Sequence, residues 1–268
     1  MRRPWLLACA VTALAAAPAW AGSVGPDSFG YAATDVAYSF IDLSTSPTAG
    51  QRHVLFSDDF PVTVDMGFNF SFYGADYTQV SWSPNGLVTF GGTSSEYDNL
   101  DLSGAALVDD LPSIAVFWDD LQYFTTGADR SYFETFGSSG NQYFVIQWND
   151  VVPYNNNTGT SSAGTFQVIL FESTGLIVMQ YADLDFGDAN YDYGASATVG
   201  IRDTGGQSNG YNLVWSHDGA ALSDGQAIAF GVGITPEPGT MALFGLGAVG
   251  LGAFVARRRR LARRPRGA

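Results

Sequence analysis

Hydrophobic and polar residues alternate strictly between residues 62 and 72. The six even-numbered positions, from Val62 to Phe72, are apolar, and none of the five odd-numbered positions carries a hydrophobic side chain. Successive side chains of a β-strand point to opposite faces, so this segment predicts a strand with one face on a core. Shorter apolar runs predict further strands at residues 80–82, 87–90, 114–118, 132–136, 142–148, 165–172, 176–181, 197–202, 212–215 and 227–230.

Turn sequences separate these segments. Ser83-Pro84-Asn85-Gly86 stands between residues 80–82 and 87–90, which should therefore pair as a hairpin. No segment keeps a 3.6-residue apolar period for three helical turns. About a dozen short strands with Gly, Asn and Asp turns predict an all-β fold, an antiparallel β-sandwich or jelly-roll-like domain.

Two segments break the alternation, because residues 143–146 and 168–171 are apolar throughout. Both faces of such strands should be covered, so we expect central strands with a loop or a second sheet above them. Residues 153–164, rich in Asn, Ser, Thr and Gly, predict an exposed loop that can cover a sheet edge.

The N-terminus has the pattern of an export signal. Two arginines precede an apolar run over residues 6–17, and Ala19 and Ala21 supply the small residues that a signal peptidase requires. We expect a signal peptide at residues 1–21, cleaved after Ala21, and export by the Sec route. Since the only cysteine, Cys9, leaves with this signal, the mature chain should contain no disulfide, which fits a bacterial envelope.

The C-terminal tail, residues 235–268, combines three features in order. Pro-Glu-Pro comes first, the uncharged apolar residues 239–256 follow, and residues 257–268 are rich in arginine. Counted with Pro238, the apolar stretch would span about 28 Å as a helix, the thickness of a bilayer's hydrocarbon core. The positive-inside rule then places the arginines in the cytoplasm and the domain at residues 22–234 outside. The stop-transfer residues are Arg257, Arg258, Arg259 and Arg260.

This tail resembles the PEP-CTERM sorting tail of Gram-negative bacteria. The resemblance rests on Pro236, Glu237 and Pro238, on the single apolar span and on the terminal arginines. It implies recognition of Pro-Glu-Pro by an exosortase, a membrane-embedded transpeptidase. It also implies a transient inner-membrane anchor, then the cell surface and association with exopolysaccharide and biofilm. The alternative is a single-pass anchor that is never cleaved.

The exported domain is strongly acidic. All of the 26 acidic residues except Glu237 fall between residues 22 and 235, against only three arginines, a net formal charge of −22. Such a domain repels nucleic acid and anionic membrane surfaces, since phosphate binding needs clustered cations. The excess charge favours solubility outside the cell, and binding of Ca²⁺ or of neutral glycans is the sharper alternative.

The order of short motifs in the exported domain resembles a nidogen-type extracellular domain. The resemblance covers roughly residues 68–201 and implies a non-catalytic interaction module. It departs from animal examples because cysteines and neighbouring modules are missing, so no partner is carried over. The segments that carry it are VSWSPNGLVTF (80–90), IAVFWDDL (114–121), residues 144–152, TFQVILFESTGLIVMQY (165–181) and ATVGI (197–201).

Two sequence patterns point to hydrolytic chemistry, but neither has the required context. Residues 206–210 fit G-x-S-x-G, yet a strand rather than a helix should follow, so the glycines indicate a turn. Ser216-His217-Asp218 should not form a triad, because adjacent residues on an extended chain point to opposite faces. Two histidines, His53 and His217, give no zinc site of recognisable spacing.

Acidic residues are the remaining candidates for chemistry. Ca²⁺ takes six to eight oxygen ligands, so we weigh a calcium site in the group formed by Asp183, Asp185, Asp188 and Asp192 against ordinary solvated loop carboxylates. Other pairs occur at residues 58–59 and 109–110.

A third pair, Asp119 and Asp120 beside Trp118, would suit a glycosidase. We prefer a core role for Trp118 and loop-forming roles for both acids. Exposed aromatic residues near Tyr191 and Tyr193 could stack on sugar rings.

From the sequence alone we therefore expect an exported, non-enzymatic adhesion or scaffolding protein with no required cofactor. The rivals are a glycan-binding or glycan-hydrolysing domain that uses acidic residues, and a Ca²⁺-stabilised structural module.

Overall fold

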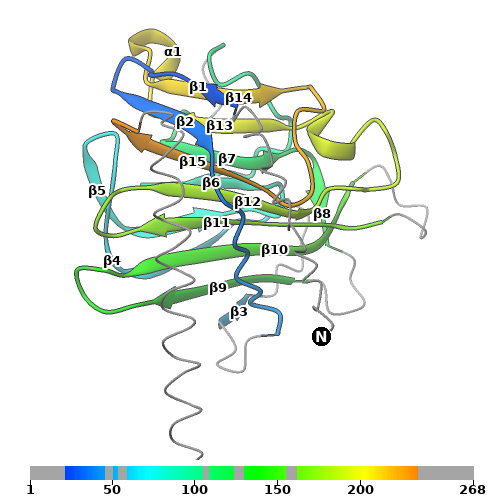
Figure 1. Cartoon of the computed structure of the whole chain (residues 1–268), viewed down its shortest axis with the longest axis horizontal. Helices are drawn as coiled ribbons and strands as arrows, with labels where there is room; N and C mark the ends of the chain where they lie inside the picture. The colour runs from blue at the N-terminus through cyan, green and yellow to red at the C-terminus, as the bar shows by residue number, and fades with distance from the viewer. Residues whose placement is uncertain are drawn as a thin grey trace, which may run out of the picture.

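The alternating segment forms one long strand, β4 (Val62–Phe72), in which Met66, Phe68, Phe70 and Phe72 are buried and the residues between them are exposed. The described residues form fifteen strands in two antiparallel sheets that pack face to face (Figure 1). The predicted all-β sandwich is confirmed. The structure, a computed structural model, describes residues 22–45, 51–53, 59–104, 109–123, 130–154 and 162–234.

The larger sheet has nine strands in the order β1-β2-β15-β12-β11-β10-β9-β3, with β8 paired to the end of β10. Strands β9 to β12 each pair with the next strand in the chain as consecutive hairpins. Strands β2 and β15, which come from the two ends of the domain, pair with each other, with Asp35 opposite Ile228. The bounds are β1 (Ser23–Val24), β2 (Tyr31–Asp35), β3 (Gln51–His53), β8 (Leu121–Gln122), β9 (Arg130–Phe136), β10 (Tyr143–Pro153), β11 (Gly164–Phe171), β12 (Ile177–Asp183) and β15 (Gln226–Val232).

The smaller sheet has six strands in the order β14-β13-β7-β6-β5-β4. As predicted, the turn at residues 83–86 joins β5 and β6 as a hairpin, in which Ser81 lies opposite Thr89 and Trp82 opposite Val88. Besides β4, the strands of the smaller sheet are β5 (Ala75–Trp82), β6 (Leu87–Thr89), β7 (Ser113–Trp118), β13 (Thr198–Arg202) and β14 (Asn212–His217).

Aromatic side chains fill the space between the two sheets. Trp82 of the smaller sheet meets Phe133 of the larger one edge to face, with ring centroids 5.3 Å apart. The Tyr181 hydroxyl donates a hydrogen bond to the Val116 carbonyl at 2.8 Å, so the phenol enters the core with its polar end paired. Burial of these rings supplies much of the driving force for folding, at roughly 25 cal/mol per Å² of apolar surface.

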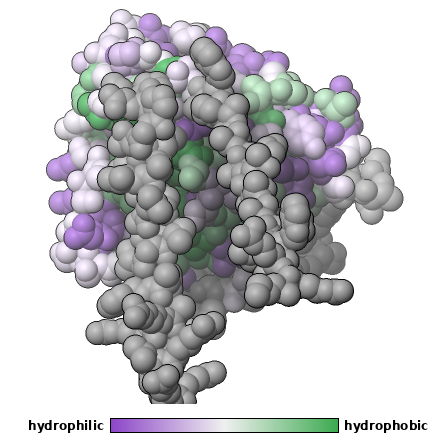
Figure 2. Space-filling view, viewed as in Figure 1, coloured by the Kyte–Doolittle hydropathy of each residue, from purple (hydrophilic) through white to green (hydrophobic). Residues whose placement is uncertain are grey.

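The outer face of the larger sheet is crossed by residues 36–45, which we call the strap (Figure 1). Leu43 of the strap is buried against Val145 of β10 and Ile169 of β11, and other apolar residues surround them on this face (Figure 2). Strands β10 and β11 are therefore covered on both faces. This confirms the expectation drawn from their continuous apolar runs.

Three buried glutamines, one on each of three adjacent strands, attach the strap to the sheet. Gln147 of β10 accepts a hydrogen bond from the Leu43 N–H at 2.7 Å. Gln180 of β12 accepts from the Ser39 N–H at 2.7 Å and donates to the Ser39 carbonyl at 3.1 Å. On β11, Gln167 contacts the backbone N and O of Ile41 at 2.9 and 3.1 Å when its amide takes the orientation that its neighbours require.

The outer face of the smaller sheet is covered by residues 93–104, which we call the cover segment. Leu102 of this segment is fully buried against Leu87, Ala115 and Trp118. The Asn99 side chain donates to Thr198 Oγ1 of β13 at 3.0 Å, and Thr198 Oγ1 donates to the Leu100 carbonyl at 3.0 Å. A loop and not a third sheet therefore completes the packing on this side.

Several elements differ from the predictions. Strands β1, β2, β3 and β8 were not predicted, and β5 begins at Ala75 rather than at residue 80. The predicted turn at residues 206–210 contains a single helical turn, α1 (Gly206–Asn209), between residues with left-handed backbone angles. Of the predicted loop at residues 153–164, positions 155–161 lie outside the described residues.

The predicted signal peptide (1–21) and the whole sorting tail (235–268) lie outside the residues that the structure describes. In the described ranges, no helix is long and apolar enough to cross a bilayer.

Candidate functional site

Asp119, a candidate glycosidase residue, is buried where β7 ends. Its Oδ2 accepts a hydrogen bond from the Ser196 hydroxyl at 2.5 Å, and its Oδ1 accepts from the Asp120 N–H at 2.9 Å. Burial raises the pKa of the Asp119 carboxyl above its ordinary value, and the hydrogen bond from Ser196 partly offsets this. The carboxylate has little contact with solvent, since the residue is only 5% exposed.

The turn that holds the two acids is fastened by Asn85, which is fully buried. Its carbonyl accepts from the Asp119 N–H at 3.2 Å, and its side-chain oxygen accepts from the Leu121 N–H at 2.9 Å. Trp118 is fully buried and donates its indole N–H to the Glu96 carbonyl at 3.2 Å. This geometry supports our preference for Trp118 as a core residue and for both acids as loop formers.

The G-x-S-x-G segment packs around a buried cation. Arg202 has no exposed side-chain surface and forms an ion pair with Asp110 at 2.6 Å. Its guanidinium also donates to Gln207 Oε1, the second residue of the pattern, at 2.5 Å. Asp110 further accepts from the Gly205 N–H at 3.0 Å. Ser208, the serine of the pattern, is exposed on α1. The segment therefore covers the buried side chain of Arg202.

His217 requires a correction to the prediction from the sequence. We expected adjacent residues of Ser216-His217-Asp218 to diverge, yet His217 Nε2 lies 3.4 Å from Asp218 Oδ2. Asp218 has a φ of 47°, which turns the chain back at the end of β14. The other ring nitrogen, Nδ1, is hydrogen-bonded to Thr198 Oγ1 at 2.8 Å, so the ring fastens β14 to β13.

The four calcium candidates each accept at least one backbone hydrogen bond in the loop after β12. Asp183 accepts from the Asp185 N–H, Asp185 from the Gly187 N–H and Asp188 from the Asn190 N–H. Asp192 accepts from the Phe186 N–H at 2.8 Å. Within the described ranges, no three His, Cys, Asp or Glu side chains converge to hold a metal ion.

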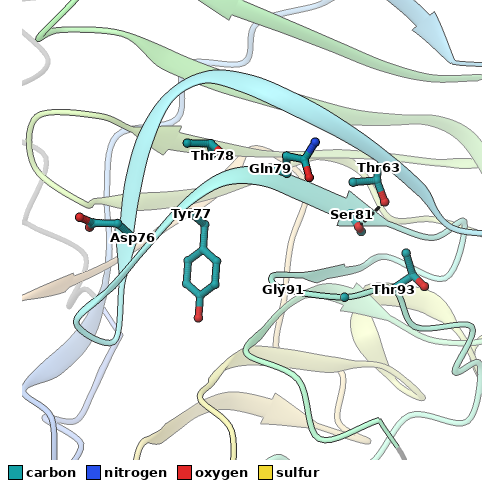
Figure 3. A pocket seen from close by; sticks show the side chains of 9 residues that line it. Thr63, Asp76, Tyr77, Thr78, Gln79, Ser81, Gly91 and Thr93 are labelled. Carbon is teal, nitrogen blue, oxygen red and sulfur yellow. Dashed lines mark hydrogen bonds between the residues drawn. The ribbon is translucent and has the colours of Figure 1, made fainter.

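A polar groove of about 370 Å³ lies on the outer face of β4 and β5 (Figure 3). On its floor, the hydroxyls of Thr63 and Ser81 are hydrogen-bonded to each other at 2.6 Å. The Tyr77 ring packs against Phe90 with centroids 5.0 Å apart. The lining residues are Thr63, Asp76, Tyr77, Thr78, Gln79, Ser81, Gly91, Gly92 and Thr93.

The far wall of the groove is the loop that follows β6. Gly91 has a φ of 74°, a left-handed conformation that glycine adopts without strain. The Thr89 hydroxyl donates to the Gly92 carbonyl at 2.9 Å and holds this loop over the sheet. The sequence prediction missed the groove because it began β5 at residue 80. The polar positions 79 and 81, which pair with the exposed positions 65 and 63 of β4, were the signal that could have revealed it.

The chain enters and leaves the described domain on two strands, β1 and β15, that lie on either side of β2. The Gly22 N–H donates to Asp35 Oδ2 of β2 at 2.7 Å. At the other end, the Gly233 N–H donates to the Gly30 carbonyl, just before β2, at 3.3 Å. The two ends of the described domain therefore lie at opposite ends of β2, with Gly22 next to Asp35 and Val232 opposite Tyr31.

Comparisons with known proteins match both parts of the chain. A family model described as NIDO related matches residues 30–237, a longer stretch than the predicted nidogen-type resemblance at 68–201. A model described as a PEP-CTERM protein-sorting motif matches residues 235–260, which include Pro236, Glu237, Pro238 and the first four arginines of the tail. No match was found among curated proteins or among solved structures.

Proposed function

Because the chain belongs to the NIDO-related family and carries a PEP-CTERM protein-sorting motif, we propose that its β-sandwich is a non-catalytic adhesion or scaffolding module. The motif implies export, processing by an exosortase and a place at the cell surface. There the sandwich would be held in the exopolysaccharide matrix of a Gram-negative bacterium.

The observation that carries this proposal is the position of the motif relative to the sandwich. Ile234 is the last described residue after β15, and Pro236 follows it by two positions. A fully extended chain of this length spans at most about 7 Å. Cleavage at the motif would therefore release or transfer the folded domain with almost nothing attached to it.

Support for a non-catalytic role comes from the side chains that could have carried a reaction. Asp119 is buried and hydrogen-bonded to Ser196, and the His217 ring is bonded to Thr198. A hydrolytic triad needs a nucleophile in hydrogen-bond reach of the base, with the base oriented by an acid. These candidates are instead engaged in fastening turns and strands.

The sorting role is tested by changing Glu237 to Ala in the full-length chain and following its mass and location in a host with an exosortase. We expect the parent to be shortened and recovered at the surface, and the variant to stay at full length in the membrane fraction. Ser223→Ala, an exposed position in the sandwich, is the matched control and should be processed normally. A parent that keeps its full-length mass and stays in the membrane fraction, as Glu237→Ala is expected to do, would establish the alternative, an anchor that is never cleaved.

The non-catalytic role is tested by incubating the parent with a panel of polysaccharides and measuring released reducing ends. We expect no turnover. Turnover that disappears in Asp119→Asn or Asp120→Asn would establish the rival, a glycan-hydrolysing domain.

A further inference from the structure

One corner of the smaller sheet carries exposed polar side chains beside an otherwise covered face. The cover segment packs Leu102 onto the middle of this sheet. Thr63 and Asp65 of β4 and Gln79 of β5 are exposed at the edge of the same sheet. Figure 3 shows the groove opening between these strands and the loop that carries Gly91 and Thr93.

The floor of the groove retains hydrogen-bonding capacity. The paired hydroxyls of Thr63 and Ser81 possess two protons, and their mutual bond at 2.6 Å uses one of them. The second proton and the remaining lone pairs are left for a ligand. The amide of Gln79, which offers two donors and one acceptor oxygen, makes no hydrogen bond to any residue that the structure describes.

Tyr77 provides an aromatic wall at the other end of the groove. Its ring is held by the contact with Phe90 and is half-buried. The Tyr77 hydroxyl is a protonated donor at neutral pH, since an ordinary phenol has a pKa of about 10 and burial raises the pKa of Tyr77 further. An aromatic ring next to several hydroxyl and amide groups suits a ligand that has both C–H faces and hydroxyl edges.

Charge restricts the class of ligand further. Among the lining residues there is one carboxylate, Asp76, and no arginine or histidine. Since the chain's acidic residues outnumber its basic ones and its net formal charge is −14, a polyanion would be repelled. The groove volume of about 370 Å³ lies in the range of about 300–1,000 Å³ that is usual for small-molecule sites.

We propose that this groove binds a neutral sugar unit of a polysaccharide, through hydroxyl and amide hydrogen bonds and the face or edge of Tyr77. β4 is the edge strand of its sheet. A polymer can therefore extend past it while one unit occupies the groove. This inference rests on the proposed matrix role and names the ligand class and the site for it.

The test uses the full-length chain in detergent micelles. Affinity electrophoresis measures how strongly the protein is retarded in gels that contain dextran, glucomannan or galactan. Alginate and hyaluronate serve as acidic comparisons. The groove variant is Gln79→Ala with Thr93→Val, two exposed positions at which loss of the polar group leaves the core intact. The matched control is Asn69→Ala with Ser71→Ala, two exposed polar positions of β4 that do not line the groove.

We expect at least one neutral polysaccharide to retard the parent and the control equally. The groove variant should bind that polymer about tenfold more weakly, as expected for the loss of two hydrogen bonds. Tyr77→Phe, which keeps the ring on Phe90, should give a smaller loss. Equal affinity of the groove variant and the parent, tighter binding of alginate than of any neutral polymer, or no binding of a neutral polymer would overturn the inference.

The sorting assay, run in parallel, separates this inference from the proposed function. If the parent is processed and retained at the surface but binds no neutral polysaccharide, the groove assignment fails and the surface role stands. If Glu237→Ala changes neither mass nor location, the sorting role fails, and the binding result still decides the groove.

Discussion

At the scale of single residues, buried polar side chains hold turns and neighbouring segments together. Asn85 connects its own turn to Leu121 and, through its amide, to Asp59 at 2.8 Å. Arg202 holds the loop of Asp110 against α1. A buried polar group without a partner costs about 1–3 kcal/mol, so each of these contacts favours one arrangement of its loop.

The burial of the Asp119 carboxyl predicts that the stability of the protein depends on pH. Because burial raises its folded-state pKa, protonation favours the folded protein. This contribution is fully present below the unfolded pKa of about 3.9 and is lost as the pH rises through the raised folded value. Asparagine does not titrate, and the Ser196 hydroxyl can accept from its amide. We therefore expect the unfolding free energy of the parent, relative to Asp119→Asn, to fall between pH 4 and pH 7.

Urea unfolding at several pH values, followed by tryptophan fluorescence, measures this difference. Asp98→Asn, a change at an exposed position, serves as the control. A parent-to-variant difference that stays constant with pH for Asp119→Asn would contradict the prediction.

At the scale of elements, the β5–β6 turn is unusual because it is buried. All four of its residues, Ser83 to Gly86, have little exposed surface, and the Val116 N–H of β7 donates to the Gly86 carbonyl at 3.0 Å. The turn therefore packs in the interior as well as reversing the chain, and its contact with β7 constrains its backbone.

Gly86→Ala should destabilise the protein far more than a matched glycine does. Gly86 has a φ of 70°, and an added Cβ would overlap the Phe117 carbonyl. Gly225 has a φ of 73° but open space around it. We expect Gly225→Ala to cost about 1–2 kcal/mol from backbone strain alone, and Gly86→Ala to cost at least about 3 kcal/mol. Thermal and urea unfolding measure both, and similar losses would show that the turn can move away from β7.

The strap is the second element whose position depends on side chains. Gln147→Ala removes the acceptor for the Leu43 N–H. We expect a loss of about 1–3 kcal/mol and faster hydrogen exchange at the Leu43 amide, because a buried donor is left unpaired. Gln142→Ala, at a half-exposed position of a turn, should change neither quantity. Unchanged exchange at Leu43 in Gln147→Ala would mean that packing alone holds the strap.

At the scale of the whole molecule, the net formal charge of −14 opposes compaction. Many of the aspartates offset part of this repulsion locally by accepting backbone N–H groups in turns, as Asp27 does from three consecutive residues after it. Longer-range repulsion among the carboxylates remains and is screened by salt over about 8–10 Å at physiological ionic strength.

Added salt should therefore raise the melting temperature. We expect NaCl between 10 and 300 mM to raise it by a few degrees through screening. CaCl2 at the same ionic strength should give no further rise, because Asp183, Asp185, Asp188 and Asp192 do not converge within the described ranges to hold a metal ion. A larger rise with calcium that disappears in Asp188→Asn would instead establish the calcium-stabilised module.

Local patterns were sufficient for much of the fold. The alternation at residues 62–72 predicted both the bounds and the buried face of β4, because burial of one face imposes a two-residue period. The continuous apolar runs predicted that β10 and β11 are covered on both faces. Strands β2 and β5 were missed or shortened, because Tyr31–Asp35 is short and the outer half of β5 is polar and exposed.

The sorting motif and the all-β class could be predicted from the sequence, because apolar length, charge order and residue period are linear properties of a chain, and the signal peptide stays a prediction. Three features could be known from the folded structure alone: β2 pairs with β15, three glutamines hold the strap, and Thr63, Gln79 and Thr93 line one groove. These groups meet through pairing between segments far apart in the chain, and such pairing depends on how all the strands pack together rather than on any local pattern.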